Sequence, residues 1–419
     1  MDFANLLAGK KDCACGREHL CPIKGVSVGK GAVNEITEYA QEYKSILLVC
    51  DSNTYRVCAN RVEQLLADKI YDVLVYESQG FLVPDELAIE QMEGKLKENT
   101  DLIIGVGSGV INDLCKYVSF KRDLPYFIVA TAPSMDGYAS NGAALIIKNM
   151  KVTYSARVPA VIIGDTDVLK DAPMDMIKAG YGDIMGKFSC LNDWKLSSLI
   201  NNEYFCQYVY DLTYDIVQKT KPLATKLLER DEDSIKTLME ALVTVGIAMA
   251  YIGTSRPASG SEHHLSHFFE ITGIINNEPY FCHGTDVAYS MLAVQQLRDE
   301  ILKIDCPENK EFNEAEWEAN IHRVYKKAAN GIIELQKKLG MIYEDKTDDY
   351  TEKLEDIKEI LREAPSVEET TAILEEIGLP IADFYQMYSR EKLADAVNYA
   401  KDLKDRYTVL WLYNDLKLN

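Results

Sequence analysis

The chain has 419 residues, of which 47% are hydrophobic and 26% are charged, a balance typical of a globular protein with two domains. Its net charge of −21 argues against a nucleic-acid partner and against docking on anionic membranes, because both need a basic face. A small anionic substrate stays open, since a few local cations can form a pocket inside an acidic protein.

The lack of a signal-peptide pattern and the distribution of the cysteines favour a cytoplasmic protein. The N-terminus lacks the apolar core of a signal peptide. The longest uncharged apolar stretch, between Glu240 and Arg256, is shorter than the ~20 residues of a membrane span, so we expect a buried helix there and no span. Ten cysteines without a regular framework are typical of reduced thiols.

One group of cysteines lies close together near the N-terminus. Cys13, Cys15 and Cys21 accompany His19 in the sequence CACGREHLC. Three thiols and an imidazole are zinc ligands, but a C-x-C pair is tighter than the usual two-to-four-residue gap. The spacing leaves two interpretations open, a metal site and a structural or variable segment, and favours the second.

Strand and helix patterns alternate over the first ~165 residues. Helical patterns include Asn60–Lys69 and Pro84–Glu98. Five short apolar runs predict strands: Ser45–Cys50, Asp72–Tyr76, Asp101–Val106, Tyr126–Ala130 and Pro159–Gly164. The alternation predicts a mostly parallel sheet with helices on both faces, and such sheets bind ligands beyond the carboxyl ends of their strands.

Beyond about Asp165 only helical patterns continue. Amphipathic stretches include Ile235–Ile252, Glu314–Leu339 and Glu352–Glu363. We therefore expect an α/β dinucleotide-binding domain over residues 1–168 and an all-α metal-binding and catalytic domain over residues 169–419, with the site in the cleft between them.

Three loops at predicted strand ends point to a dinucleotide. Residues 105–109 read GVGSG and precede a helical pattern, where glycines and a helix N-terminus can approach a pyrophosphate. Asp51 ends the first predicted strand and can bind a ribose diol, or simply cap a helix. The loop Thr131–Ser140 adds hydroxyls and a carboxylate. A tight turn explains each loop alone, but their coincidence favours a dinucleotide site.

Four of the six histidines fall within 21 residues and indicate a metal. His263 and His267 are four apart and share one face of a helix, and His283 follows. Asp183, in a Gly-Tyr-Gly-Asp turn near a helix start, is the candidate charged ligand, although such an acid can also cap a helix. One carboxylate and two imidazoles leave open positions, as in catalytic sites, and suit zinc, nickel or ferrous iron.

These residues together carry a family resemblance that covers nearly the whole chain. The chain resembles the iron-containing alcohol dehydrogenase and dehydroquinate synthase-like superfamily, and within it the sn-glycerol-1-phosphate dehydrogenases, including their bacterial branch. The motifs are GVGSGVINDLCKY, TAPSMDGYAS, GYGDIMGKFSCLNDWKLS, SGSEHHLSHFFE, HGTDVAYS and KDRYTVLWL. Val106 departs from the common GGG turn, and His264 replaces a position that is often apolar.

The resemblance implies roles for individual residues. It implies a metal held by Asp183, His263 and His283, and catalytic contacts from Asp136, Asp183 and His267 to the substrate. It also implies dinucleotide contacts from Asp51, Gly107, Ser108, Gly109, Val110, Ile111, Asn112, Asp113, Thr131, Ala132, Pro133, Ser134 and Ser140. The implied reaction is the reduction of dihydroxyacetone phosphate by NADH or NADPH to sn-glycerol 1-phosphate, in a homodimer or larger oligomer that uses zinc or nickel.

The phosphate requires a cation, and the sequence offers Lys187, Lys195 and Arg256, each of which can equally be a surface charge or an ion pair.

Without such a cation, a glycerol or other polyol dehydrogenase is the better interpretation of the sequence. A dehydroquinate synthase-like lyase, which recycles NAD, is a second alternative, and a non-catalytic metal- or nucleotide-binding protein is a third. Asp51 would repel a 2′-phosphate, which favours NAD over NADP.

Overall fold

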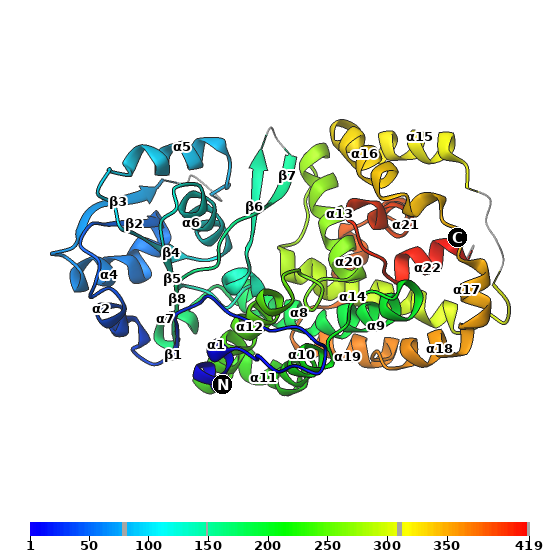
Figure 1. The fold of residues 1–419 in the computed structure, drawn as a ribbon, viewed down its shortest axis with the longest axis horizontal. Helices are drawn as coiled ribbons and strands as arrows, with labels where there is room; N and C mark the ends of the chain where they lie inside the picture. The colour runs from blue at the N-terminus through cyan, green and yellow to red at the C-terminus, as the bar shows by residue number, and fades with distance from the viewer. Residues whose placement is uncertain (78–81, 148–149, 308–311, 417–419) are drawn as a thin grey trace. The chain divides into compact units, whose positions relative to one another are not determined.

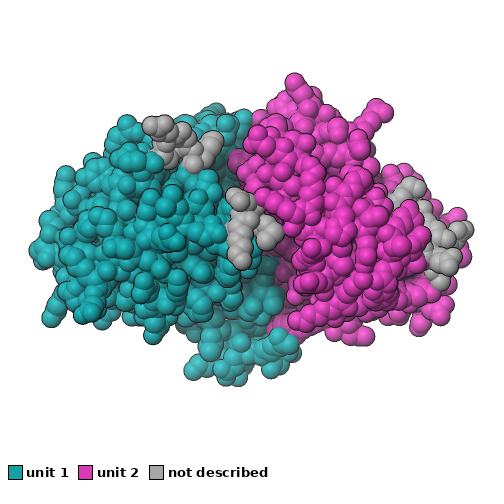
Figure 2. Space-filling view, turned by 90° about the horizontal axis from the view of Figure 1, so that it is seen from above, with its two compact units in different colours: residues 1–184, 222–255 teal, residues 185–221, 256–419 magenta. Residues whose placement is uncertain are grey.

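The computed structural model describes residues 1–77, 82–147, 150–307 and 312–416. Two compact units, coloured separately in Figure 2, make up the chain. Unit 1 comprises Met1–Ile184 and Pro222–Ser255, and unit 2 comprises Met185–Lys221 and Arg256–Asn419. Unit 1 therefore adds helical segments from beyond residue 168 to the sheet that precedes them.

A six-stranded sheet forms the centre of unit 1 (Figure 1). Its strands are β1 (Gly25–Gly29), β2 (Ile46–Asp51), β3 (Ile70–Tyr76), β4 (Leu102–Gly107), β5 (Tyr126–Ala130) and β8 (Val161–Asp165). They lie in the order β1-β8-β5-β4-β2-β3, and every neighbouring pair is parallel. All five predicted strands are present, which confirms the predicted α/β class with a parallel sheet.

Three strands were missed by the sequence analysis. β1 reads GVSVG and pairs on one side only, with β8, so it lacks the long apolar run of a central strand. β6 (Gly142–Ile147) and β7 (Met150–Ser155) pair with each other as a separate two-stranded antiparallel sheet. The sheet is consequently wider by one edge strand than the sequence predicts.

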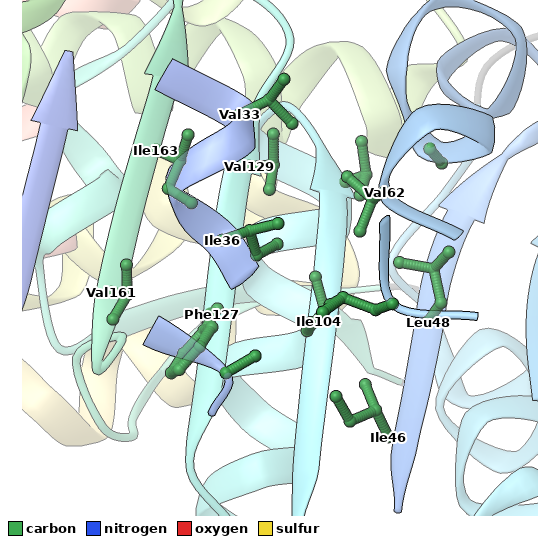
Figure 3. Packing of buried hydrophobic residues seen from close by; sticks show 14 of the residues in the cluster. Val33, Ile36, Ile46, Leu48, Val62, Ile104, Phe127, Val129, Val161 and Ile163 are labelled. Atoms are coloured by element: carbon green, nitrogen blue, oxygen red, sulfur yellow. The ribbon is translucent and has the colours of Figure 1, made fainter. Parts of the chain in front are cut away.

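Alternate residues of the central strands build one hydrophobic face (Figure 3). Ile46 and Leu48 of β2 continue across the sheet into the corresponding side chains of β4, β5 and β8. Val33, Ile36 and Val62 cover this face from η1 (Ala32–Glu35), α2 (Ile36–Tyr39) and α4 (Asn60–Leu65). The period of two places each strand's remaining residues on the opposite face, where α6 (Gly109–Lys121) packs against β4.

Unit 1 contains further helical elements besides those that cover the sheet. They are α1 (Phe3–Ala8), α3 (Ser52–Thr54), η2 (Tyr55–Ala59), α5 (Glu86–Lys95), η3 (Asp136–Ala139), α7 (Thr166–Leu169), α8 (Met174–Met185), α11 (Ala224–Leu228) and α12 (Glu232–Ile252). By length and composition α12 could cross a membrane, but 72% of its apolar window is buried inside the protein. The expected buried helix in this region is therefore confirmed.

Every regular element that the structure describes in unit 2 is helical. The unit contains α9 (Lys187–Asn201), α10 (Gln207–Thr220), α13 (Ser261–Asn276), α14 (His283–Ile301), α15 (Glu314–Tyr325), η5 (Lys326–Ala328), α16 (Ala329–Leu339), η6 (Met341–Tyr343), α17 (Thr347–Glu352), α18 (Leu354–Arg362), α19 (Val367–Glu376), α20 (Ile381–Met387), α21 (Arg390–Tyr399), η7 (Ala400–Leu403) and α22 (Val409–Asp415), and η4 (Lys221–Leu223) links the two units. The helical patterns of the second half are thereby confirmed.

Candidate functional site

The carboxyl ends of β2, β4 and β5 bring several predicted dinucleotide residues together. β2 and β4 are neighbours in register, with Val49 opposite Gly105, although β3 lies between them in the chain. Gly107 stands opposite Ala130 of β5, and the Thr131 N–H donates to the Gly107 carbonyl at 3.1 Å. The chain reverses its direction across the sheet between β2 and β4, and such a switch point is where parallel sheets bind nucleotides.

Asp51 occupies the end of β2 and also caps the short helix α3. Its Oδ1 accepts hydrogen bonds from the backbone N–H groups of Asn53 and Thr54 at 2.8 and 2.9 Å. The capping interpretation of this residue is thus correct. Because both bonds use Oδ1, the carboxylate keeps Oδ2 for a ligand at the edge of the sheet.

The glycines of the GVGSG turn have different surroundings. A Cβ at Gly105 would lie 2.8 Å from Cys115 Sγ, and one at Gly107 would lie 2.6 Å from Ile111 Cβ. These two glycines let α6 pack closely on β4. A Cβ at Gly109, the first residue of α6, would meet nothing nearer than Met135 Cε at 3.5 Å. Gly109 therefore carries the open backbone at the helix N-terminus.

Lys116 is a buried residue that hydrogen-bonds to several groups at this edge of the sheet, and it was not predicted from the sequence. Its ammonium donates to the carbonyls of Gly137 and Gly142 at 2.9 and 2.8 Å and to Ser140 Oγ at 3.2 Å. Burial lowers the pKa of Lys116, while the nearby Asp113 carboxylate opposes that shift. The residue lies one helical turn after Asp113 in the motif GVGSGVINDLCKY, and that spacing was the available signal.

Asp183 lies inside a helix, so the expected Gly-Tyr-Gly-Asp turn near a helix start was wrong. The residue is in the last turn of α8 and is fully buried. A Cβ at Gly180 would lie 1.8 Å from the Pro133 carbonyl oxygen, so this glycine serves close helix packing rather than a turn. The approach lets Asp183 Oδ2 accept a hydrogen bond from the Asp136 N–H at 2.9 Å. Two predicted catalytic residues, Asp136 and Asp183, are therefore joined directly.

Three histidines gather in unit 2. His263 and His267 lie on α13, as their spacing predicted, and His283 begins α14. The ring centroid of His283 is 5.1 Å from that of His263 and 5.3 Å from that of His267. Ligand atoms of His263 and His283 lie within 4.8 Å of each other, and the same holds for His267, Glu270 and His283. His283 therefore belongs both to the His263–His283 pair and to the group of His267, Glu270 and His283.

Polar neighbours orient the two rings predicted as ligands. Glu262 Oε1 lies 2.7 Å from His263 Nδ1 and also accepts the Gly260 N–H at 2.9 Å. Ser266 Oγ lies 3.3 Å from His283 Nδ1. A carboxylate on Nδ1 fixes the ring and leaves Nε2 as the donor atom, the arrangement that supports metal-bound histidines. This arrangement fits a metal site at His263.

The three predicted phosphate cations differ in their surroundings. Lys195 pairs with Glu363 at 2.5 Å, and Arg256 donates to Glu203 at 2.9 Å, so both form structural ion pairs. Lys187 is fully buried, and its charge acts on Glu262 and His263.

Two further cations lie near the histidine helix and were not singled out from the sequence. Lys404 Nζ donates to Ser259 Oγ at 3.2 Å, and Arg406 donates to the Ser259 carbonyl at 2.6 Å. The Lys404 charge also acts on His263, where burial is the main cause of a pKa well below the usual value. Both residues lie in the motif KDRYTVLWL, which gave the only signal.

Comparison with known proteins identifies relatives over the whole chain. Residues 27–173 match the family model of iron-containing alcohol dehydrogenases. Glycerol-1-phosphate dehydrogenase [NAD(P)+] of Halalkalibacterium halodurans is 36% identical over 294 residues, which cover 68% of this chain and 73% of that protein. The protein of the same name from Geobacillus thermodenitrificans is 29% identical over 421 residues, covering 99% and 98%. An archaeal relative of that name, from Methanosarcina mazei, is 31% identical and covers 69% and 82%. These matches confirm the family resemblance.

Solved structures share the fold at low sequence identity. A probable glycerol dehydrogenase from Sinorhizobium meliloti 1021 aligns with a TM-score of 0.62 at 14% identity, covering 94% of this chain and 95% of that one. Sulfoacetaldehyde reductase from Bifidobacterium kashiwanohense, solved in complex with NAD+, also aligns with a TM-score of 0.62 at 14% identity, covering 96% and 98%. At this identity the likeness concerns the fold alone.

Proposed function

Because the chain belongs to the glycerol-1-phosphate dehydrogenase family within the iron-containing alcohol dehydrogenases, we propose that it reversibly reduces dihydroxyacetone phosphate to sn-glycerol 1-phosphate. The cofactors are NAD(H) or NADP(H) and one divalent metal, namely zinc, nickel or iron. The observation that carries the proposal is the His263–His283 pair with Glu262 behind it, in a chain whose other unit has a nucleotide-type switch point.

We assign the metal to His263, His283 and Asp183. Two imidazoles with a carboxylate behind one of them suit a borderline divalent cation. Asp183 contributes the negative charge: it is fully buried, and its Oδ2 accepts a hydrogen bond from the Asp136 N–H. The set leaves positions for a substrate oxygen, as a catalytic site requires. The alternative set of ligands is His267, Glu270 and His283. If metal-content measurements showed that the Asp183→Ala variant keeps this metal, the alternative set would be favoured.

The chemistry that such a cation supplies is polarisation of a carbonyl oxygen, and the dinucleotide supplies the hydride. His267 is the residue that we assign to the proton that joins the reduced oxygen, because its ring lies one helical turn from His263 and 5.3 Å from His283. Its Nδ1 lies 3.9 Å from Glu270, which can orient the ring and offset an imidazolium charge. The Asp136 N–H holds Asp183 in place, and the Asp136 side chain is assigned to a substrate hydroxyl.

The dinucleotide contacts follow the carboxyl edge of the sheet. Asp51 accepts from the ribose diol, and the turn from Gly107 at the end of β4 to Asp113 in the first part of α6 receives the pyrophosphate. Residues 131–134 and Ser140 complete the contacts, and Lys116 fixes the position of Ser140. For the substrate phosphate, Lys187 and Lys404 are the proposed cations, since Lys195 and Arg256 are engaged in ion pairs.

The test is a comparison of substrates with the intact, metal-loaded enzyme. We expect NADH to be consumed one-for-one with dihydroxyacetone phosphate, and glycerol 1-phosphate to be oxidised in reverse. Turnover of glycerol without turnover of its phosphate would instead identify a polyol dehydrogenase. Carbocycle formation without net NADH consumption would identify a dehydroquinate synthase-like lyase.

The assembly and the location of the enzyme are also part of the proposal. We propose a homodimer or larger homo-oligomer in the cytoplasm, in line with the family resemblance and the ten cysteines that lack a disulfide framework. Light scattering coupled to size-exclusion chromatography measures the mass of the assembly directly. A single mass equal to that of one chain would contradict the oligomer.

A further inference from the structure

The N-terminal motif CACGREHLC folds into a closed turn in unit 1. Lys10 and His19 pair as a two-residue antiparallel bridge, with both backbone N–H···O distances at 2.9 Å. Within this loop the Gly16 N–H donates to the Cys13 carbonyl at 2.9 Å, and Gly16 has a φ of +80°, which favours glycine. The bridge brings His19, near the end of the motif, back beside Lys10, which precedes the motif. The spacing of the cysteines alone does not predict this contact.

The turn places two thiols beside one imidazole. Ligand atoms of Cys13, Cys15 and His19 all lie within 4.8 Å of one another, and Cys15 Sγ is 3.3 Å from His19 Nε2. In a tetrahedral zinc site a thiolate and an imidazole nitrogen stand about 3.5 Å apart, as follows from bond lengths of about 2.3 and 2.0 Å. The Cys15–His19 pair is therefore already at the spacing of two ligands.

The orientation of the His19 ring is set by the backbone of α12. His19 is fully buried, and its Nδ1 lies 3.1 Å from the Tyr251 carbonyl oxygen. A carbonyl can only accept, so Nδ1 carries the hydrogen and Nε2 presents its lone pair towards the thiols. A backbone carbonyl that fixes the tautomer in this way is the usual support of a metal-bound histidine. The Tyr251 carbonyl lies outside the cysteine cluster and therefore supports the ring independently of the thiols.

We propose that Cys13, Cys15 and His19 bind a structural zinc ion, distinct from the catalytic metal of the proposed function and not dependent on it. Two thiolates and an imidazole select zinc over hard cations, and a further thiolate or a water completes four-coordination. The ion holds the His19 ring of the N-terminal segment in place against the Tyr251 carbonyl of α12. Two other contacts join the same parts: the N-terminal ammonium pairs with Glu240 at 2.9 Å, and the Tyr251 hydroxyl donates to the Leu6 carbonyl.

Metal content by mass spectrometry of the full chain, purified without chelator, tests the site. We expect two equivalents per wild-type chain, and one in the Cys13→Ser/Cys15→Ser variant, which keeps its turnover. Cys306→Ser is the matched control: its thiol is exposed and contacts its neighbour's carbonyl, so two equivalents stay bound. Equal metal content in the wild type and the double variant would overturn the proposal.

Cobalt substitution identifies the ligand type, and it does so without reliance on turnover. We expect the near-ultraviolet charge-transfer band of a cobalt thiolate in the wild type and in His263→Ala, and its absence in Cys13→Ser/Cys15→Ser. A single Cys13→Ser variant with a weakened band serves if the double variant fails to fold. A mass lower by two hydrogens in the wild type, from a Cys13–Cys15 disulfide, would contradict the zinc site.

The role of the ion is tested by proteolysis on a His263→Ala background, so that chelation acts on the N-terminal site. Arg17 lies on the exposed part of the turn, between Cys15 and His19. Chelator should speed tryptic cleavage after Arg17, and added zinc should restore protection. The same cleavage rate with and without chelator would show that no metal holds this segment.

Discussion

In unit 1, Gly180 brings α8 against the Pro133 carbonyl, whereas in unit 2 the approach of His263 to His283 depends on side chains held by Glu262 and Ser266. The edge of the sheet is thus shaped by the backbone: glycines, carbonyls and N–H groups set its form. The histidine site is shaped by imidazoles and their polar supports. Substitutions in the first region should act through packing, and those in the second through metal affinity.

The largest effect is expected at the histidine site itself. His263→Ala should lose one bound metal and slow turnover about 1,000-fold, because Lewis-acid stabilisation contributes several kcal/mol and each 1.36 kcal/mol is tenfold in rate. Steady-state kinetics and metal analysis measure both. His322→Ala, at an exposed histidine of α15, is the control and should change neither. Full turnover by His263→Ala would remove this residue from the site.

Packing at the sheet edge should show the next largest effect. Gly180→Ala places a Cβ 1.8 Å from the Pro133 carbonyl oxygen, so the free energy of unfolding should fall by about 3 kcal/mol, as for an overpacked core. Chemical denaturation measures it. Gly331→Ala is the matched control in helix α16, where a Cβ meets nothing within 4 Å, and should stabilise by about 0.5–1 kcal/mol. Equal changes in the free energy of unfolding in the two variants would contradict the close packing assigned to Gly180.

Glu262, which supports the proposed metal ligand His263, should have an intermediate effect. Glu262→Gln replaces the carboxyl group that orients His263 by an amide and should weaken metal binding about 10- to 100-fold, with the fold intact. Competition with a chromophoric chelator gives the affinity. Glu375→Gln, at an exposed glutamate of α19, should leave the affinity unchanged. An unaltered affinity in Glu262→Gln would show that the imidazoles need no such support.

The proposed role of Lys404 as a phosphate cation is tested by Lys404→Met. The KM for dihydroxyacetone phosphate should rise about tenfold, since a hydrogen bond to a charged group contributes about 1.5–3 kcal/mol. Lys195→Met is the control, because that ammonium pairs with Glu363. If the two variants raise the KM equally, Lys404 has no special relation to the phosphate.

The smallest effect is expected at Asp51. Asp51→Ser keeps a side-chain cap for α3 and removes the charge, so stability should hold while the preference for NADH over NADPH falls about fivefold, the equivalent of about 1 kcal/mol of repulsion in water. Ratios of kcat/KM for the two dinucleotides measure this preference. An unchanged ratio would place the ribose elsewhere.

The sequence predicted features whose signals are local. Five buried strands were found because each is a continuous apolar run, and the shared helix face of His263 and His267 follows from their spacing. The wrong turn at Asp183 has a tertiary cause: glycines in sequence suggest a turn, and the partner that requires Gly180, the Pro133 carbonyl, lies far away in the chain.

The partners of charged residues could not be predicted from the sequence for the same reason. Lys195 pairs with Glu363, 168 residues away, and Arg256 pairs with Glu203, 53 residues away, so no spacing rule separates these ion pairs from phosphate ligands. At the N-terminus the C-x-C spacing is poor for zinc, yet the Lys10–His19 bridge brings His19 to the thiols. The sequence shows which residues can bind a metal or a phosphate, but it does not show which residues they contact in the fold.

We propose that the enzyme carries out a metal-dependent hydride transfer on a phosphorylated triose, with Asp183, His263 and His283 as the metal ligands. The most direct test of this proposal is steady-state oxidation of the two glycerol phosphate enantiomers after the enzyme is stripped of metal and reloaded. We predict that sn-glycerol 1-phosphate alone is oxidised, that stripping abolishes the rate, and that zinc, nickel or iron restores it. Full activity without metal, or equal oxidation of both enantiomers, would contradict the account.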